Sequence, residues 1–286
     1  MFNIDRFFWA LRKIRLPIDS KALVLDVGSG GNPFPRSDVL LDRLTGDDHR
    51  NGESMMIDRA CVFGDAARMP FKDNAFDFVI ASHILEHMSK PEIFIKELQR
   101  VGKAGYIETP NALFERLQPF HIHCLEIVKV GDILHIYKKN KPVHDTFLGA
   151  GNLLSAKAPL GKLMFKKAKL FHIEHLWRKK IKFKIHNPNV SCDWIEQIND
   201  RSDIGEIKES YVVDVMEQSG WRDFGMVVLN AFYSYKRKKR LKDFDLTSIL
   251  ACPNCLGDLE VSNEKLNCNN CKSKYSFKDG IPNFCN

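Results

Sequence analysis

Apolar and polar residues alternate along the first 110 positions in a way that predicts a parallel α/β sheet. Short apolar runs have the length and composition of buried strands. They span residues 22–27, 38–41, 60–63, 77–81 and 104–108. Residues 91–101 repeat apolar side chains at helical spacing behind Pro91, a residue that suits the first turn of a helix. Strands that alternate with helices form parallel sheets, so we expect an α/β fold.

The rest of the chain carries weaker patterns. Residues 2–16 interleave Phe and Leu with Arg and Lys, which predicts an amphipathic helix that ends before Pro17. Residues 122–138 predict a hairpin that turns at Gly131 and Asp132, and we expect it to cover the active site. Further on, the pattern predicts a helix at 208–219, strands at 223–229 and 231–235, and an exposed basic linker at 236–240.

Three acidic residues close successive apolar runs near the start of the chain. They are Asp26, Asp42 and Asp65. In an open α/β sheet, ligands bind outside the carboxyl ends of the strands, so acids at three strand ends converge on one crevice. A nucleoside cofactor is the natural occupant of such a crevice.

The loop after Asp26 narrows the choice of cofactor. Gly28 and Gly30 let the backbone turn tightly and approach a ligand that a Cβ would exclude. The following Asn-Pro-Phe-Pro at 32–35 leaves little room for the helix whose N-terminus holds the pyrophosphate of NAD. The sequence therefore favours a cofactor without phosphate, and S-adenosylmethionine meets that description.

The chemistry of S-adenosylmethionine assigns a role to each acid. Asp42 can accept both ribose hydroxyls, and Asp65 can accept the adenine amino group while the N–H of Ala66 reaches a ring nitrogen. The glycine loop leaves room for the methionine part above a buried Asp26. With Ser82, directly after the fourth strand, the predicted cofactor residues are Asp26, Gly28, Ser29, Gly30, Asp42, Asp65, Ala66 and Ser82.

The stretch from Gly64 to His87 (GDAARMPFKDNAFDFVIASHILEH) resembles the class I S-adenosylmethionine-dependent methyltransferases of the methyltransferase type 11 group. The resemblance covers residues 20–110 well and 205–235 more weakly. It implies a Rossmann-like sheet of seven strands with helices on both faces, and the same roles for the three acids. We assign residues 1–240 to this domain, with 111–190 as an insertion that covers the substrate.

Catalytic residues of methyl transfer are poorly marked in a sequence. The reaction is an in-line displacement, so the protein supplies alignment, and it needs a base only if the acceptor must lose a proton. His83 follows the fourth strand and is the candidate base or acceptor-orienting group. We interpret Glu86 and His87 as structural or capping residues. His121 and His123 alternate in a predicted strand, where only one of them faces inward.

Positive charge is concentrated in one segment of the chain. The net charge of the 286 residues is +7, and residues 157–184 hold ten Lys or Arg against one acidic residue. Interleaved aromatic residues suit binding to RNA, whereas an amphipathic helix with Trp and Leu suits an anionic membrane surface. A solvated protein surface accounts for the same charges, and the sequence leaves the three alternatives open.

Four of the eight cysteines form two C-x-x-C pairs near the end of the chain. They are Cys252, Cys255, Cys268 and Cys271. Two such pairs a dozen residues apart predict a tetrahedral structural zinc site, and metal binding fits a reducing compartment better than disulfides do. Because neither a signal peptide nor an apolar run of membrane-spanning length is evident, we expect a cytoplasmic location, with peripheral membrane contact left open.

Residues 247–284 resemble the small zinc-ribbon activator proteins that partner methyltransferases acting on tRNA, rRNA and release factors. The resemblance implies a zinc-ribbon domain at 246–286 that is carried in the same chain. The sequence is consistent with three functions. The favoured one is methyl transfer to a small molecule or saccharide, including a lipid-linked one; the others are methyl transfer to RNA and a catalytically silent nucleoside-binding scaffold.

Overall fold

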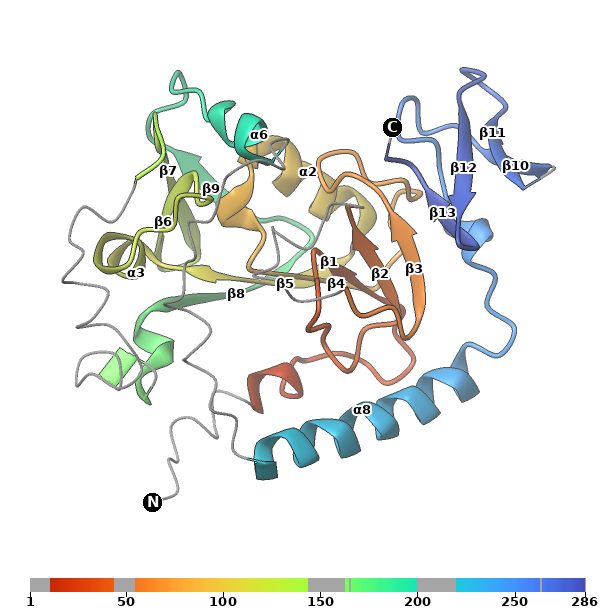
Figure 1. Cartoon of the computed structure of the whole chain (residues 1–286), viewed down its shortest axis with the longest axis horizontal. Coiled ribbons are helices and arrows are strands. Elements are labelled where there is room, and N and C mark those ends of the chain that lie inside the picture. Colours follow the sequence, from red (N-terminus) through yellow and green to blue (C-terminus); the bar gives the residue numbers. More distant parts are fainter. Residues whose placement is uncertain are drawn as a thin grey trace.

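The computed structural model describes residues 11–43, 55–143, 163–164, 166–199, 220–262 and 264–285. Its centre is a single sheet in the strand order β10-β11-β12-β13-β3-β2-β1-β4-β5-β8 (Figure 1). The strands of the first domain are β1 (Val24–Val27), β2 (Val39–Asp42), β3 (Ala60–Phe63), β4 (Phe78–Ser82), β5 (Ala104–Pro110) and β8 (His172–Arg178). The first five of these pair in parallel, and β8 pairs antiparallel to β5.

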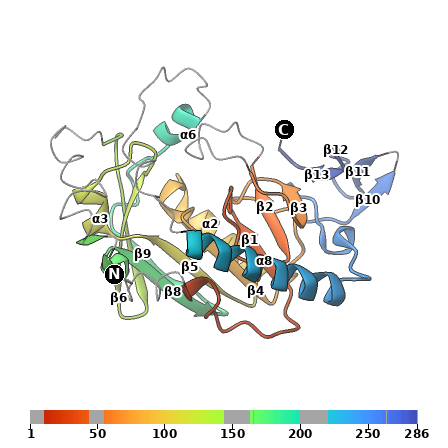
Figure 2. The same cartoon turned by 60° about the horizontal axis from the view of Figure 1, so that its bottom comes forward.

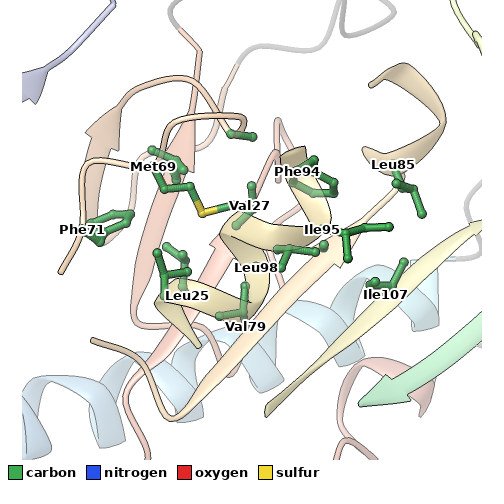
Figure 3. Packing of buried hydrophobic residues seen from close by; sticks show 14 of the residues in the cluster. Leu25, Val27, Met69, Phe71, Val79, Leu85, Phe94, Ile95, Leu98 and Ile107 are labelled. Carbon is green, nitrogen blue, oxygen red and sulfur yellow. The ribbon is translucent and has the colours of Figure 1, made fainter. Parts of the chain in front are cut away.

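Helices cover both faces of this sheet, which confirms the predicted fold class. Helix α2 (Pro91–Val101) has Pro91 in its first turn and buries Phe94, Ile95 and Leu98. These side chains meet Leu25, Val27 and Val79 in one hydrophobic core (Figure 3). Helix α8 (Gly220–Arg240) runs along the opposite face (Figures 2 and 3). All four residues of β1 are buried, as a strand with both faces covered requires.

The prediction for the segment before the cysteine-rich end was wrong. Helix α8 takes the place of the strands predicted at 223–229 and 231–235 and of the linker predicted at 236–240. The last turn of α8 binds the sheet: Arg237 donates to the carbonyl oxygen of Ser37 at 3.0 Å, and Arg240 donates to that of Ala22 at 2.6 Å. Arg240 also pairs with the buried Asp38. The expected sheet of seven strands therefore has six in the described part of the first domain.

The region at 111–190 forms a second, smaller sheet. Helix α3 (Ala112–Leu117) precedes the predicted hairpin, which is confirmed as β6 (Leu125–Val130) and β7 (Ile133–Lys138). Strand β9 (Lys182–Ile185) pairs with β7. The described part of the basic segment folds as the 3-10 helix η4 (Ala168–Leu170), β8 and β9, so it does not form one amphipathic helix.

Two other predicted helices fall wholly or partly outside the described residues. Of the helix predicted at 2–16, residues 1–10 are not described, and Leu11–Lys13 form the 3-10 helix η1. The helix predicted at 208–219 lies entirely outside the described residues. Within the described ranges, no helix combines the length and the apolar character needed to cross a membrane.

The cysteine-rich end of the chain extends the main sheet. It contains η5 (Leu246–Ile249), β10 (Leu259–Ser262), β11 (Lys265–Cys268), β12 (Lys274–Lys278) and β13 (Ile281–Asn283). Strand β13 lies beside β3, where the N–H of Phe284 donates to the carbonyl oxygen of Phe63 at 2.8 Å (Figure 1). Leu250, 1% exposed, pairs with Phe71 in the same core. The two domains thus share a sheet and a hydrophobic core.

Candidate functional site

A cleft of about 480 Å³ opens at the carboxyl ends of β1 to β4. Parallel strands place these ends on one edge of the sheet, which is where ligands bind in open α/β sheets. Six of the predicted site residues line the cleft: Gly28, Gly30, Asp42, Asp65, Ala66 and His83. A cleft of this size is in the ordinary range for small-molecule sites.

The glycine loop has the conformation that its sequence predicts. Gly28 and Gly30 adopt φ of 67° and 52°, in the left-handed region that favours glycine. A Cβ on Gly28 would come within 2.5 Å of a side-chain carbon of Ile84, which also lines the cleft. The place of a Cβ at Gly28 is therefore already filled by Ile84, and any other residue would force Ile84 to shift.

Two carboxylates face the cleft with acceptor capacity to spare. Asp42 accepts the N–H of Gly30 at 2.9 Å through Oδ2 and that of Arg43 at 2.9 Å through Oδ1. Asp65 accepts the N–H of Ala67 at 2.9 Å through Oδ1. An ionised carboxylate can accept about four hydrogen bonds, so each can bind a ligand hydroxyl or amino group without losing these contacts.

Asp26, Ser29 and Ser82 are not among the residues that line the cleft. Asp26 is 1% exposed and accepts the N–H of Phe34 at 2.7 Å, so it ties the Asn-Pro-Phe-Pro turn to β1. Burial raises the pKa of Asp26 to about 6, against the opposing effect of that hydrogen bond. Ser29 Oγ is buried without a hydrogen-bond partner in the described structure, whereas Ser82 donates to Glu108 at 3.2 Å.

His83 is held between two buried carboxylates. It adopts φ of 55°, its Nε2 lies 3.2 Å from Glu108 Oε1, and its Nδ1 lies 3.3 Å from Glu86 Oε1. Burial opposes the charged ring, but the two carboxylates outweigh burial and raise the pKa of His83 to about 9. An imidazolium has no lone pair with which to accept a proton. This geometry favours the orienting role over the role of base.

Glu108 is the centre of a network that sequence patterns did not indicate. It is fully buried and accepts from Arg12 through both of its oxygens, with the Arg12 Nη2 to Oε1 distance at 2.8 Å. It also accepts the hydroxyl of Tyr106 at 2.7 Å. After the cost of burial, His83 and Arg12 hold the pKa of Glu108 far below its ordinary value. Arg12 is distant in sequence, so only the fold brings it here.

Aromatic rings continue from His83 into the 111–190 region. The ring of His172 lies 5.3 Å from that of His83, and Phe114 lies 5.6 Å from His172. Phe120 stacks on Phe114 at 6.0 Å. Of the segment 122–138 that was expected to cover the site, Ile122 lines the cleft, whereas the paired strands β6 and β7 are not among the lining residues. Helix α6 (Trp194–Asn199) also lines the cleft.

The four predicted zinc ligands converge. Their sulfur atoms all lie within 4.8 Å of one another, and the closest pairs are Cys252 with Cys271 at 3.5 Å and Cys255 with Cys268 at 3.4 Å. Thiolates about 2.3 Å from one tetrahedral zinc ion stand about 3.8 Å apart, so this arrangement suits zinc. Cys285 is not part of the cluster.

Each C-x-x-C pair closes in the same way. The residue after the second cysteine of each pair takes a left-handed conformation, Leu256 with φ of 58° and Lys272 with φ of 62°. Its N–H donates to the carbonyl oxygen of the first cysteine, at 2.7 Å in the first pair and 3.2 Å in the second. Tyr275 places its hydroxyl 3.1 Å from Cys252 Sγ. The two C-x-x-C turns therefore have the same backbone geometry, and their four sulfur atoms surround one position.

Two known families match the chain. Residues 25–107 match the methyltransferase domain family of type 11, and residues 243–280 match the Trm112p-like protein family. The first match holds the acidic strand ends and the glycine loop, and the second holds all four clustered cysteines. One segment of the chain thus matches methyltransferase domains, and a second segment matches Trm112p-like proteins.

Two curated relatives match over short stretches. Ajmaline N-methyltransferase of Rauvolfia serpentina is 48% identical over 42 residues, which are 15% of this chain and 14% of that protein. Demethylmenaquinone methyltransferase of Renibacterium salmoninarum is 35% identical over 88 residues, 29% of this chain and 37% of that protein. The chain therefore matches well under half the length of either relative.

Solved structures resemble the chain more broadly at low sequence identity. A complex of the Haloferax volcanii Trm112 methyltransferase activator with a methyltransferase has a TM-score of 0.38 and 13% identity, and the match covers 62% of this chain and 90% of that one. A methyltransferase structure from Bacillus halodurans has a TM-score of 0.31 and 20% identity, covering 42% and 70% of the two chains.

Proposed function

We propose that the protein transfers a methyl group from S-adenosylmethionine to a small-molecule or saccharide acceptor in the cleft at the carboxyl ends of β1 to β4. The observation that carries the proposal is the pair of carboxylates at Asp42 and Asp65, which line one cleft together with the glycine loop. The strand order β3-β2-β1 puts Asp42 between this loop and Asp65. The match of residues 25–107 to a methyltransferase family supports it.

The residues present fit this cofactor. Asp42 is placed to accept the ribose hydroxyls, and Asp65 with the N–H of Ala66 is placed for the adenine edge. The left-handed glycine loop lets the backbone approach the methionine part closely, and the buried, unpartnered hydroxyl of Ser29 can turn to a polar group of it. When bound, the cofactor supplies an electrophilic methyl group. Asp26 does not line the cleft, and it acts by holding the turn that follows the glycine loop.

The chain's own contribution to the reaction is alignment. His83 lines the cleft, and the rings of His172 and then Phe114 continue from it, which offers an aromatic surface on which an acceptor ring can stack. Glu108 and Glu86 hold the two nitrogens of the charged His83 ring, so the ring presents a fixed face that can orient an acceptor toward the methyl group. In-line displacement gains most from such fixed positioning.

An aromatic surface next to a cleft is typical of small-molecule sites, which is why we favour a small acceptor. We further propose that zinc in the cysteine cluster is structural, because four thiolates leave no open position. Residues 1–240 and 246–286 are the proposed domains, and 111–190 supplies the acceptor side.

The acceptor is best found without assuming its identity. We would compare methylated metabolites in cells that overproduce the wild-type protein or Asp65→Ala, with Asp132→Asn as a control because Asp132 is an exposed hairpin residue. A methylated small product that depends on Asp65 supports the proposal. If the methylated product is RNA, and the affinity of the protein for RNA falls steeply as the salt concentration rises, the acceptor is RNA and the proposal of a small acceptor is wrong.

A further inference from the structure

A second group of metal-ligand side chains lies at the rim of the cleft. Glu86 and His87 end the 3-10 helix η3 (Leu85–His87), and His123 lies in the turn before β6. One ligand atom from each of the three lies within 4.8 Å of the others. The sequence separates His123 from the other two by more than 30 residues, so the fold alone assembles the group.

Hydrogen bonds fix both histidine rings in the form that binds metals. His87 Nδ1 lies 2.9 Å from the carbonyl oxygen of Ile122, which can only accept, so Nδ1 carries the proton and the lone pair of the neutral ring is on Nε2. His123 Nδ1 contacts Glu115 in the same way, and Glu115 accepts from Lys139 at 2.9 Å. A carbonyl or carboxylate behind each ring is the usual support of metal-binding histidines.

Glu86 has a buried oxygen whose described contact is the ion pair with His83. The residue is 1% exposed, and its Oε2 accepts the hydroxyl of Thr109 at 2.9 Å. Its Oε1 lies 3.3 Å from His83 Nδ1 but makes no hydrogen bond of acceptable geometry in the described structure. The ion pair with His83 compensates part of the cost of burying this oxygen, and its remaining lone pairs can serve a ligand.

We propose that Glu86, His87 and His123 bind a divalent transition-metal ion, separate from the cysteine cluster. Two imidazole nitrogens and one carboxylate oxygen suit zinc, iron(II), cobalt(II) or manganese(II), and three protein ligands leave coordination positions open. Ligands about 2.1 Å from one ion stand roughly 3 to 3.5 Å apart, so binding draws the three side chains inward by about 1 Å.

An ion held by His87 would lie close to an acceptor in the cleft, because His87 and His83 both line it. The metal would thus take an oxygen-bearing acceptor, such as a hydroxylated ring or a sugar. A divalent ion holds such an oxygen in place and lowers the pKa of its hydroxyl. This part of the inference rests on the proposed methyl transfer, whereas metal binding itself does not.

Cobalt(II) provides a test that separates the two metal sites. The full-length protein is first loaded with one equivalent of Zn²⁺, which the four thiolates bind in preference to two imidazoles and one carboxylate, and is then titrated with Co²⁺ by calorimetry and absorption spectroscopy. We expect one Co²⁺ per chain, without the thiolate charge-transfer band that cobalt would show in the cysteine cluster. We expect its affinity to fall at least about tenfold in His87→Gln and in His123→Gln.

The control is His186→Gln, which changes an exposed histidine that pairs with His135 on the second sheet. It should bind Co²⁺ as the wild-type protein does. If the buried His123 variant does not fold, the partly buried His87 variant decides, with circular dichroism and thermal unfolding as the check on its fold. Absence of Co²⁺ binding to the protein that carries one zinc ion per chain, or equal binding by His87→Gln, would overturn the proposal. Failure of S-adenosylmethionine to bind would instead overturn the proposed function.

Discussion

The ion pair between Arg12 and Glu108 should contribute far more to stability than an exposed pair of the same chemistry. Glu108 is fully buried, and the Arg12 side chain is 17% exposed. Arg12→Ala removes two hydrogen bonds to a buried carboxylate, and breaking such a pair from one side costs about 3 to 5 kcal/mol. Tyr106, Ser82 and His83 still contact Glu108, so we expect the lower end, about 3 kcal/mol.

The matched control is Arg116→Ala, since Arg116 donates to Glu126 at 2.9 Å while its side chain is 72% exposed. Exposed pairs contribute about 0 to 1 kcal/mol. Thermal unfolding at pH 7.5 should place the melting temperature of Arg12→Ala about 6 to 12 °C below the wild type, and that of Arg116→Ala within about 3 °C. A double-mutant cycle with Glu108→Gln then isolates the pair itself.

The dependence on pH follows from the low pKa of Glu108. A carboxyl group whose pKa is lowered by folding adds stability above its unfolded pKa of 4.5, and this stability is lost as pH falls through the folded pKa. The gap between wild type and Arg12→Ala should therefore persist from pH 8 down to pH of about 5. If the melting temperatures of Arg12→Ala and Arg116→Ala fall by the same small amount, the network around Glu108 does not hold the N-terminal segment to β5.

Two further predictions concern buried charge and metal. Because burial raises the pKa of Asp26 to about 6, stability is lost as pH rises from the unfolded value of 3.8 through that pKa. At pH 8, Asp26→Asn should therefore be more stable than the wild type by about 2 kcal/mol in free energy of unfolding and should unfold at a higher temperature. This difference in stability should disappear near pH 4. A variant less stable than the wild type at pH 8 would contradict the prediction. Removal of zinc by a chelator, or Cys271→Ser, should lower the melting temperature of the whole chain, because Leu250 and Phe284 of the ribbon pack in the common core. Separate unfolding of the ribbon, with the first domain unchanged in calorimetry, would refute that coupling.

Local patterns were sufficient for the elements whose apolar residues repeat at a regular spacing. Strands β1 to β5 and helix α2 were predicted within two or three residues, since each is a buried run or a single apolar stripe. Helix α8 was missed because Val227 and Val228 favour strands by local propensity. Its helical form brings Arg237 and Arg240 to one side, where they bind groups near Asp38 that lie about 200 positions earlier.

The cofactor side of the site was predictable because strand ends of one sheet meet by geometry. The acceptor side was not, since His172, Phe114 and Ile122 come from separate elements of the 111–190 region and share no sequence pattern. The same holds for the candidate metal site. Glu86 and His87 were interpreted as structural or capping residues because nothing local connects them to His123.

Calorimetric titration with S-adenosylmethionine tests the central claim most directly. The account predicts one molecule bound per chain, with affinity lowered at least about 100-fold in Asp42→Ala, since two charge-assisted hydrogen bonds to the ribose would be lost. Asp132→Asn should bind as the wild type does. No binding by the wild-type protein, or equal binding by Asp42→Ala, would contradict the account.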